Sequence, residues 1–210
     1  MRLRHVKGAK EKIKNHPKFI IDHTKGETLL LDQKFTKKKI HVEIGMGKGQ
    51  FIYTLAKNHP DIQFVGIEKY DSVIVRALEK LIEEPLDNLL LLRADANFLL
   101  NFFNPSSIER IYLTFSDPWP KNRHEKRRLT HHRFLKMYET LLIDDGDLHF
   151  KTDNDPFFTY SLESVTSYPM TITYQTRDLH NDASHPNVMT EFEEKFKKLH
   201  QHINKLIAKF

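Results

Sequence analysis

The chain alternates short apolar runs with longer segments in which apolar residues recur every three to four positions. The short runs are five to eight residues long and rich in Ile, Leu, Val and Phe, a pattern typical of buried strands. The longer segments are apolar along one side only, which is typical of helices that pack on a sheet. This alternation predicts βαβ units and a mostly parallel sheet covered by helices on both faces.

The predicted strands share a continuous apolar core and comprise residues 40–44, 62–68, 88–93, 108–115, 148–152 and 170–174. The predicted helices lie between them, at about 51–58, 73–82, 98–103, 134–142 and 156–165. Thr130 is the expected N-cap of the fourth helix, and Asp144 to Asp147 the turn before the fifth strand. Residues 177–187 are polar and predict a loop, and the residues alone predict one helix over 190–208.

The first 36 residues form a basic extension, and residues 37–210 form the main domain. Twelve lysines and arginines stand against four acids in residues 1–39, a net charge of +8, so the remainder nets −3 of the total +5. Such asymmetry is typical of an arm that binds a polyanion. A solvated tail that only aids solubility is the alternative. The chain shows no Gly- or Ser-rich linker and no internal repeat.

Composition excludes several classes of function. The chain has no cysteine, which rules out disulfides, thiolate metal sites and a cysteine nucleophile. No apolar run reaches the roughly 20 residues that span a bilayer, and the start lacks the apolar stretch of a signal peptide. We therefore expect a cytoplasmic protein without a membrane partner. His131-His132 and His200-x-His202 lack a carboxylate at metal-binding spacing, so we expect no metal site.

Glycines or acids follow three consecutive predicted strands. Gly45 and Gly47 turn the chain after the first strand, Glu68 ends the second, and Asp95 follows the third. Loops after parallel strands meet at one edge of the sheet, where ligands of open α/β sheets bind. An acid at the position of Glu68 has the spacing that grips ribose hydroxyls. A tight turn without a ligand, and solvated strand ends, are the alternatives.

The glycine turn differs from the dinucleotide fingerprint G-x-G-x-x-G, because its third glycine, Gly49, comes one residue early. Glu43 lies just before the turn, where a carboxylate would repel a diphosphate and suit an ammonium group. S-adenosylmethionine has an ammonium group and a ribose but no phosphate. The sequence therefore favours S-adenosylmethionine over a nicotinamide dinucleotide.

An acid, a stiff aromatic turn and a basic loop follow the fourth strand. Asp117 precedes Pro118-Trp119-Pro120, which holds the only tryptophan of the chain, and Lys121 comes next. The acid and the turn are typical of the rim of an active site. The basic run 123–128 is typical of a segment that contacts phosphates. The alternatives are a capping role for Asp117 and a solvated charge run. Trp119 either stacks on a base or props the loop.

These residues resemble a known family. Residues 43–49, 66–68, 95–96 and 115–121, with the Arg-His-x-Lys-Arg-Arg run after them, are similar to the bacterial tRNA (guanine-N7)-methyltransferases. Lys151-Thr152-Asp153 and Thr190-Glu191-Phe192-Glu193 match two further motifs of that family. The likeness covers roughly residues 40–200. It ends at the N terminus, where Val6-Lys7-Gly8-Ala9 stands in place of the Lys-Pro-Trp-Ala that family members often carry.

The resemblance implies a class I S-adenosylmethionine-dependent methyltransferase fold, a Rossmann-like α/β sheet of seven mostly parallel strands whose last strand is antiparallel. It also implies a helix that ends near Leu199 and an edge strand near 203–209, in place of one long helix. The implied activity is methyl transfer from S-adenosylmethionine to N7 of a guanosine in tRNA.

The resemblance and the chemistry of the side chains together suggest roles for individual residues. The expected cofactor-binding residues are Glu43, Gly45, Gly47, Glu68, Asp95 and Asp117, and Asp117 is also the expected catalytic residue. The expected guanosine contacts are Lys121, Asp153, Thr190 and Glu193, and the expected RNA contacts are Arg123, His124, Lys126, Arg127 and Arg128. Asp153 has a competing explanation as the N-cap of the following helix.

Three other functions remain open from the sequence. A methyltransferase of another nucleic-acid base is the first, although exocyclic-amine enzymes carry an acid-Pro-Pro-aromatic turn and this chain has Asp-Pro-Trp-Pro. A non-enzymatic RNA-binding domain that kept the fold is the second. An NAD-linked enzyme is the third.

Overall fold

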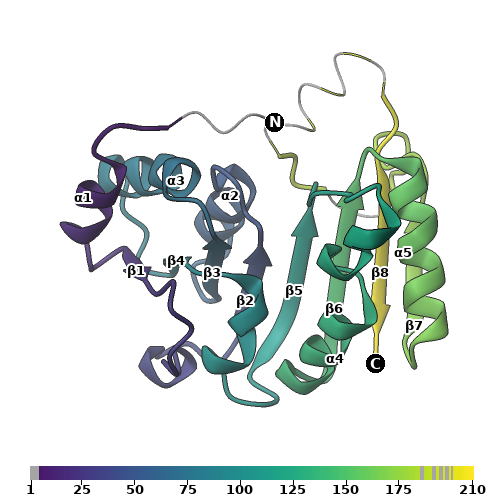
Figure 1. The fold of residues 1–210 in the computed structure, drawn as a ribbon, viewed down its shortest axis with the longest axis horizontal. Coiled ribbons are helices and arrows are strands. Elements are labelled where there is room, and N and C mark those ends of the chain that lie inside the picture. The colour runs from purple at the N-terminus through teal and green to yellow at the C-terminus, as the bar shows by residue number, and fades with distance from the viewer. Residues whose placement is uncertain (1–4, 185–186, 191–192, 194–195, 197–198, 200) are drawn as a thin grey trace. The chain divides into compact units, whose positions relative to one another are not determined.

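The computed structural model describes residues 5–184, 187–190, 193, 196, 199 and 201–210. The chain divides into two compact units, Met1–Asn104 and Pro105–Phe210. Each unit contains its own set of paired strands with helices packed on them (Figure 1).

The first unit contains four parallel strands in the order β1-β4-β3-β2. Their bounds are Ile20–Asp22 for β1, Ile40–Ile44 for β2, Gln63–Glu68 for β3 and Leu89–Arg93 for β4. Every residue of β2 and β3 is buried, as continuous apolar runs in a parallel sheet require. The parallel pairing brings the carboxyl ends of β2, β3 and β4 to one edge of this unit.

Three α-helices and two short 3-10 helices complete the first unit. The α-helices are α1, Ala9–Lys14, α2, Gln50–Asn58, and α3, Asp71–Glu83, and the 3-10 helices are η1, Asp32–Lys34, and η2, Ala96–Asn101. Helix α1 packs on α3, where Lys12 donates a 2.7 Å hydrogen bond to Glu79. Because β1 pairs with β4 and α1 packs on α3, the described part of the basic extension is built into this unit.

The second unit contains four strands in the order β5-β6-β8-β7. Their bounds are Ile108–Thr114 for β5, Leu142–Thr152 for β6, Thr171–Thr176 for β7 and Asn204–Lys209 for β8. Strands β5 and β6 are parallel, whereas β8 runs antiparallel to both β6 and β7. Among the described residues, its helices are η3, Asn122–Arg127, α4, His132–Leu141, and α5, Asp155–Ser167. Helices α4 and α5 contact each other and both pack on β6, so they cover one face (Figure 1).

A buried polar cluster joins β5 to β6 in the second unit. Arg110 donates to both carboxylate oxygens of Asp147, and the Nη2 bond measures 2.9 Å. Burial raises the pKa of Asp147, but the hydrogen bonds from His149 and Arg110 outweigh it and lower the pKa to about 2. Burial lowers the pKa of His149 to about 4, so this imidazole is neutral at pH 7.

All six strands predicted from the hydrophobic pattern are present, and the antiparallel last strand that the family resemblance implied is confirmed. The described residues form eight strands rather than the expected seven, because the three-residue β1 adds to β4. Strand β8 is not an edge strand, since it lies between β6 and β7. A single helix over 190–208 is wrong, because 204–209 is extended. The predicted helix end near Leu199 involves residues outside those described.

Two local predictions are also wrong. Thr130 is not the N-cap of α4, because Thr130 is fully buried and its hydroxyl lies 2.8 Å from that of Ser161 on α5. His131 holds the cap position, and its ring nitrogen accepts from the backbone N–H of Arg133. The turn expected at Asp144 to Asp147 is part of β6, which pairs with β5 across an irregularity in register.

Candidate functional site

The glycine turn lies between β2 and α2 in the first unit. Gly45, Gly47 and Gly49 all have positive φ, at 76°, 61° and 76°, so the turn needs residues that tolerate left-handed backbone. A Cβ on Gly49 would lie 2.7 Å from the Cβ of Ala77, whereas a Cβ on Gly47 would meet no atom within 4 Å. Gly49 therefore allows α2 to approach α3, and Gly47 borders open space in which a ligand can lie against the backbone.

Two buried carboxylates lie beside this turn. Glu43 is fully buried near the end of β2, and Glu68 is 9% exposed at the end of β3. The carboxylate of Glu68 accepts from the backbone N–H of Gly47 at 3.2 Å and from that of Tyr70 at 3.0 Å. The structure thus brings together Glu43, Gly45, Gly47 and Glu68, as the sequence predicted for a ligand edge.

Asp95 follows β4 at the same edge of the first unit. It is the N-cap of η2, where its side chain accepts from the backbone N–H of Asn97 at 2.9 Å. Lys69, the residue after Glu68, donates to the other oxygen of Asp95 at 2.7 Å. Burial raises the pKa of Asp95, but the bonds from Lys69 and Asn97 outweigh burial and lower it. Asp95 is therefore ionised at pH 7 and is tied to the end of β3.

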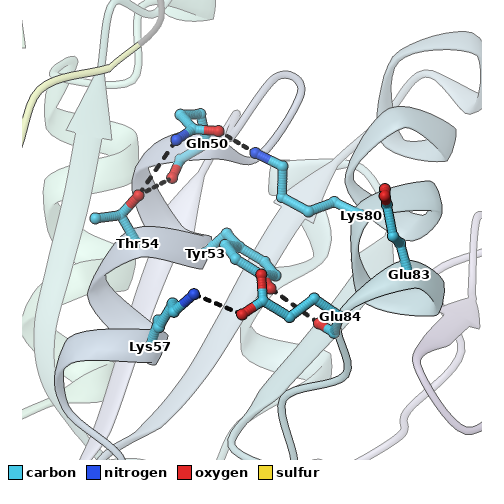
Figure 2. Close-up of a pocket in the computed structure, with 7 residues that line it drawn as sticks. All are labelled: Gln50, Tyr53, Thr54, Lys57, Lys80, Glu83 and Glu84. Atoms are coloured by element: carbon cyan, nitrogen blue, oxygen red, sulfur yellow. Dashed lines mark hydrogen bonds and ion pairs between the residues drawn. The ribbon is translucent and has the colours of Figure 1, made fainter.

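The helices behind the turn enclose a surface pocket of about 480 Å³ (Figure 2). The side chains that line it come from α2, α3 and the residue after α3, and they are Gln50, Tyr53, Thr54, Lys57, Lys80, Glu83 and Glu84. Lys57 pairs with Glu84, Lys80 bonds Gln50, and the hydroxyl of Tyr53 donates to the carbonyl of Glu84 at 2.9 Å. Burial raises the pKa of Tyr53 to about 12, so the hydroxyl stays protonated. These bonds hold α2 against α3 and so support the glycine turn.

Asp117 follows β5 in the second unit, on a segment with two left-handed residues. Phe115 has φ of 52° and Trp119 has φ of 42°, and such conformations cost about 1–3 kcal/mol each in a residue other than glycine. The backbone N–H of Phe115 donates to the carbonyl of Lys151 at 2.9 Å, which fixes the segment to the end of β6. The side chain of Asp117 is exposed, so it is accessible to a ligand.

The basic loop carries side chains in two different settings. Lys121, Arg123, Lys126 and Arg127 are exposed, whereas His124 and Arg128 are partly buried. Arg127 stacks on Trp119 at 4.9 Å from the ring centroid, and His124 meets the same ring edge-on at 5.6 Å. Desolvation, and then the neighbouring cations Arg127, Arg123 and Lys121, lower the pKa of His124, which keeps it neutral at pH 7.

Arg128 faces its own loop. Its Nε donates to the carbonyl of Pro118 at 3.1 Å and of Trp119 at 3.3 Å, and its Nη2 donates to the carbonyl of Trp119 at 3.1 Å. Its guanidinium also lies 4.1 Å from the ring centroid of Tyr160 on α5. The five basic-loop residues that the sequence predicted as RNA contacts therefore differ in exposure and in the groups that they contact.

Asp153 lies in the loop between β6 and α5, and its side chain is exposed. Asn154 is the N-cap of α5, because its side chain accepts from the backbone N–H of Phe157 at 2.8 Å. Asn154 therefore fills the N-cap role that was the alternative to a ligand role for Asp153.

Thr190 and Glu193 form a capping box. The backbone N–H of Glu193 donates to the hydroxyl of Thr190 at 3.0 Å, and the Glu193 carboxylate accepts from the backbone N–H of Thr190 at 3.4 Å. The carboxylate is fully buried and forms a 2.9 Å ion pair with Lys151, which is 4% exposed. The Nζ of Lys151 also donates to Asn187 and to the carbonyl of Val188, at 2.9 Å each. Glu191 and Phe192 of the same motif lie outside the described residues.

Lys151 belongs to a motif of the resembled family, but no role was expected for it from the sequence. A lysine inside a buried strand is the signal that would have identified it, because a buried ammonium needs an acid. Lys205 lies opposite Lys151 on β8. Burial, and then repulsion from Lys151, lower the pKa of Lys205 to about 8.

The described part of the chain lacks two features. It contains no cluster of three or more His, Asp or Glu side chains that could hold a metal ion. No helix among those residues combines the length and apolarity needed to cross a membrane.

The edge of the first unit suits a zwitterionic nucleoside better than a dinucleotide. A buried carboxylate precedes the turn, at Glu43, where a diphosphate would be repelled. Glu68 ends the next strand at the position of a ribose-binding acid, and Gly47 leaves open space beside it. These observations fit S-adenosylmethionine, which has an ammonium group and a ribose.

Comparison with known proteins connects both units to one family. Residues 37–206 match a family model described as "Putative methyltransferase". A tRNA (guanine-N(7)-)-methyltransferase of Geobacillus sp. (strain WCH70) is 53% identical over 197 residues, which cover 93% of this chain and 90% of the relative. A tRNA (guanine-N(7)-)-methyltransferase of Bacillus cytotoxicus is 48% identical over 211 residues, which cover 100% of this chain and 97% of the relative.

Solved structures are similar at the level of the fold. The 16S rRNA methyltransferase KamB matches with a TM-score of 0.62 at 12% identity, over 83% of this chain and 88% of that one. The antibiotic-resistance methyltransferase Kmr matches with a TM-score of 0.58 at 15% identity, over 85% of this chain and 90% of that one. These matches confirm the class I methyltransferase fold.

Proposed function

This chain belongs to the family of tRNA (guanine-N7)-methyltransferases, and from that premise we propose how its residues perform the reaction. The enzyme transfers a methyl group from S-adenosylmethionine to N7 of a guanosine in tRNA, and it acts in the cytoplasm. The observation that carries this conclusion is the 48% identity to such an enzyme over the whole chain.

S-adenosylmethionine, when bound, supplies an electrophilic methyl group on a sulfonium that leaves readily. Glu43 holds the ammonium of the methionine moiety, because a buried carboxylate gains most from a charged hydrogen-bonding partner. Glu68 accepts from the ribose hydroxyls while its bonds to Gly47 and Tyr70 keep the carboxylate in place. Asp95 contacts the adenine side, and Gly45 and Gly47 allow the ligand to lie close to the backbone.

The guanosine needs positioning rather than deprotonation, because N7 already carries an available lone pair. Holding N7 in line with the methyl group lowers the barrier by converting an encounter into an oriented step. Positive charge moves onto the guanine during transfer, and Asp117 stabilises it electrostatically. Lys121 and Asp153, both exposed, contact the guanosine, and Asp153 accepts from the pairing edge of a base that has left its stack.

Thr190 and Glu193 lie on the guanosine side, and the Glu193 carboxylate supports Thr190 rather than contacting the base. That carboxylate is fully buried and is bonded to Lys151, to Asn187 and to the backbone N–H of Thr190. Exposed Arg123, Lys126 and Arg127 bind tRNA phosphates, and neutral His124 supports Trp119 beside them.

Methyl transfer from labelled S-adenosylmethionine to unmodified tRNA, followed by nucleoside identification, tests this function. We expect N7-methylguanosine, a cationic and alkali-labile nucleoside, as the labelled product. Label on another base would establish a methyltransferase of different specificity. Absence of S-adenosylmethionine binding in calorimetry would leave only an RNA-binding function.

A further inference from the structure

We infer that Arg128 is a positioning residue that holds the Asp117 loop in its reactive shape, rather than one of the phosphate contacts of the basic loop. The inference concerns the same reaction and rests on the proposed function for its activity readout only. It starts from the three hydrogen bonds that the Arg128 guanidinium donates to the carbonyls of Pro118 and Trp119.

Those bonds act on a backbone that needs support. Trp119 has φ of 42° although it carries a large side chain, and it precedes Pro120, which further restricts the conformations open to it. A conformation of this kind persists only where the surroundings hold it. The fork of a guanidinium reaches two successive carbonyls at once, whereas a lysine ammonium lacks that planar geometry.

Arg128 is itself fixed from several sides. Its backbone N–H donates to the carbonyl of Glu125 at 2.9 Å, and its own carbonyl accepts from the N–H of His131 at 3.0 Å. Its guanidinium lies on the ring of Tyr160 from α5, at 4.1 Å from the centroid. Its side chain is partly buried, whereas Arg123, Lys126 and Arg127 are exposed. An arginine held in this way has little freedom to move and can fix the backbone carbonyls that it bonds.

The bonds from Arg128 restrict the position of Asp117. Phe115 is pinned to β6 by its bond to the Lys151 carbonyl, and Pro118 is pinned by Arg128, so only Ser116 and Asp117 lie between the two anchors. Loss of either anchor would let the Asp117 carboxylate move relative to the methyl acceptor. A displacement of about 1 Å from a residue outside the chemistry is enough to reduce the rate roughly 10²-fold.

The chain offers a clean optical probe of this geometry, because Trp119 is its only tryptophan. In the Arg128→Ala variant we expect increased acrylamide quenching of Trp119 emission and a kcat on tRNA about 10²-fold lower. The slope of log K against log salt for tRNA binding should stay at its wild-type value, because no phosphate contact is lost.

Arg123→Ala is the matched control, since it removes an exposed arginine of the same loop. We expect its salt slope to fall by about one while the quenching of Trp119 stays as in the wild type. The Arg128→Lys variant keeps the charge and guards against misfolding of the alanine variant. It should retain the full salt slope and still show altered quenching and reduced kcat, because an ammonium does not reproduce the fork.

Three results would overturn the inference. One is a fall of about one in the salt slope of Arg128→Ala, as for a phosphate contact. Another is wild-type quenching of Trp119 in Arg128→Ala, and the third is wild-type quenching and kcat in Arg128→Lys. The comparison of Trp119 quenching between the wild type and the two alanine variants does not require catalysis. If the wild-type protein failed to methylate tRNA, the proposed function would be overturned, whereas the quenching of Trp119 would still decide this inference.

Discussion

At the scale of single residues, Asp117 and Glu193, two of the three acids assigned to the guanosine side in the second unit, differ in their surroundings. Asp117 is exposed on a loop held at both ends, whereas Glu193 is fully buried and bonded on all sides that the structure describes. An exposed carboxylate on a held loop suits stabilisation of charge that develops on a bound base. A buried, ion-paired carboxylate suits the ordering of its own segment.

Replacement of Asp117 by Asn should lower kcat by about 10²–10³-fold while tRNA binding is retained, because the amide keeps the shape and loses the charge. Single-turnover methylation and tRNA binding by filter retention would measure the two effects separately. Asp61→Asn, which changes an exposed acid with no proposed role, is the control and should keep wild-type activity. Full activity of the Asp117 variant would remove the electrostatic role assigned to it.

Replacement of Lys151 by Met should destabilise the protein by about 3–5 kcal/mol, because it leaves the Glu193 carboxylate buried without its ammonium. Glu193→Gln should cost less, and the double variant should cost less than the sum of the single ones. Urea unfolding of all three variants measures the coupling. If Glu193→Gln kept wild-type stability and only raised the KM for tRNA, Glu193 would contact the guanosine directly.

Sequence reasoning identified residues whose position along the chain fixes their location, such as Glu68 at the end of a strand and Asp117 after another. It did not identify contacts set by tertiary packing. Thr130 has the chemistry of an N-cap, yet the hydroxyl of Ser161 from α5 engages it, and His131 takes the cap. The pairing of Lys151 with Glu193 joins residues 42 positions apart, and no local pattern reveals it.

At the scale of elements, Gly47 and Gly49 in the turn between β2 and α2 lack a side chain for different structural reasons. Gly49 is the N-cap of α2 and touches Ala77 of α3, so its missing side chain serves helix packing. Gly47 faces open space and donates to Glu68, so we propose that its missing side chain leaves room for a ligand.

Gly47→Ala should therefore weaken S-adenosylmethionine binding by about tenfold or more, equivalent to ~1.4 kcal/mol, because a methyl group enters the ligand space. Its cost in stability should be limited to the left-handed backbone, about 1–2 kcal/mol. Gly49→Ala should carry that cost plus about 1–3 kcal/mol of overpacking against Ala77. Calorimetry and thermal unfolding compare the two variants, and equal loss of stability would refute this division.

The hydrophobic pattern was sufficient to predict β2 to β7 because each is a continuous or alternating apolar run. It failed for β8, Asn204–Lys209, whose lysines and alanine are compatible with a helix. Pairing with β6 and β7 on both sides overrides that local preference, and only the family resemblance indicated a strand. Strand β6 includes Asp144–Asp147 although its register against β5 shifts there, with Leu142 opposite Ile108 and Asp147 opposite Arg110.

At the scale of the whole molecule, the charge asymmetry of the sequence has a structural counterpart in the first unit. The described part of the basic extension is anchored by α1 on α3 and by β1 on β4, rather than forming a separate tail. Some basic residues of the extension are therefore paired with acids of the same unit, as Lys12 is with Glu79. Whether a separate boundary falls at residue 37 stays a prediction, which limited proteolysis would test.

Stability should fall with acid in two steps, and the cluster on β5 and β6 determines the first. The pKa of His149 is about 4 in the folded protein against about 6.5 when unfolded. The unfolded state therefore binds an extra proton between these values, and stability present above pH 6.5 is lost as the pH falls toward 4. Asp147, with a folded pKa of about 2, adds a second loss below the ordinary pKa of an aspartate.

A shift of this size in His149 corresponds to roughly 3 kcal/mol between pH 7 and pH 4. Urea unfolding at half-unit steps of pH measures it, and His149→Gln, which does not titrate, should remove most of the slope above pH 4. Asp147 then remains ionised beside Arg110, so the variant should keep the part of the loss at lower pH that Arg110 causes and lose the part that His149 causes. If His149→Gln retained the full wild-type slope, the acid sensitivity would arise from another group, and the neutral buried state assigned to His149 would be wrong.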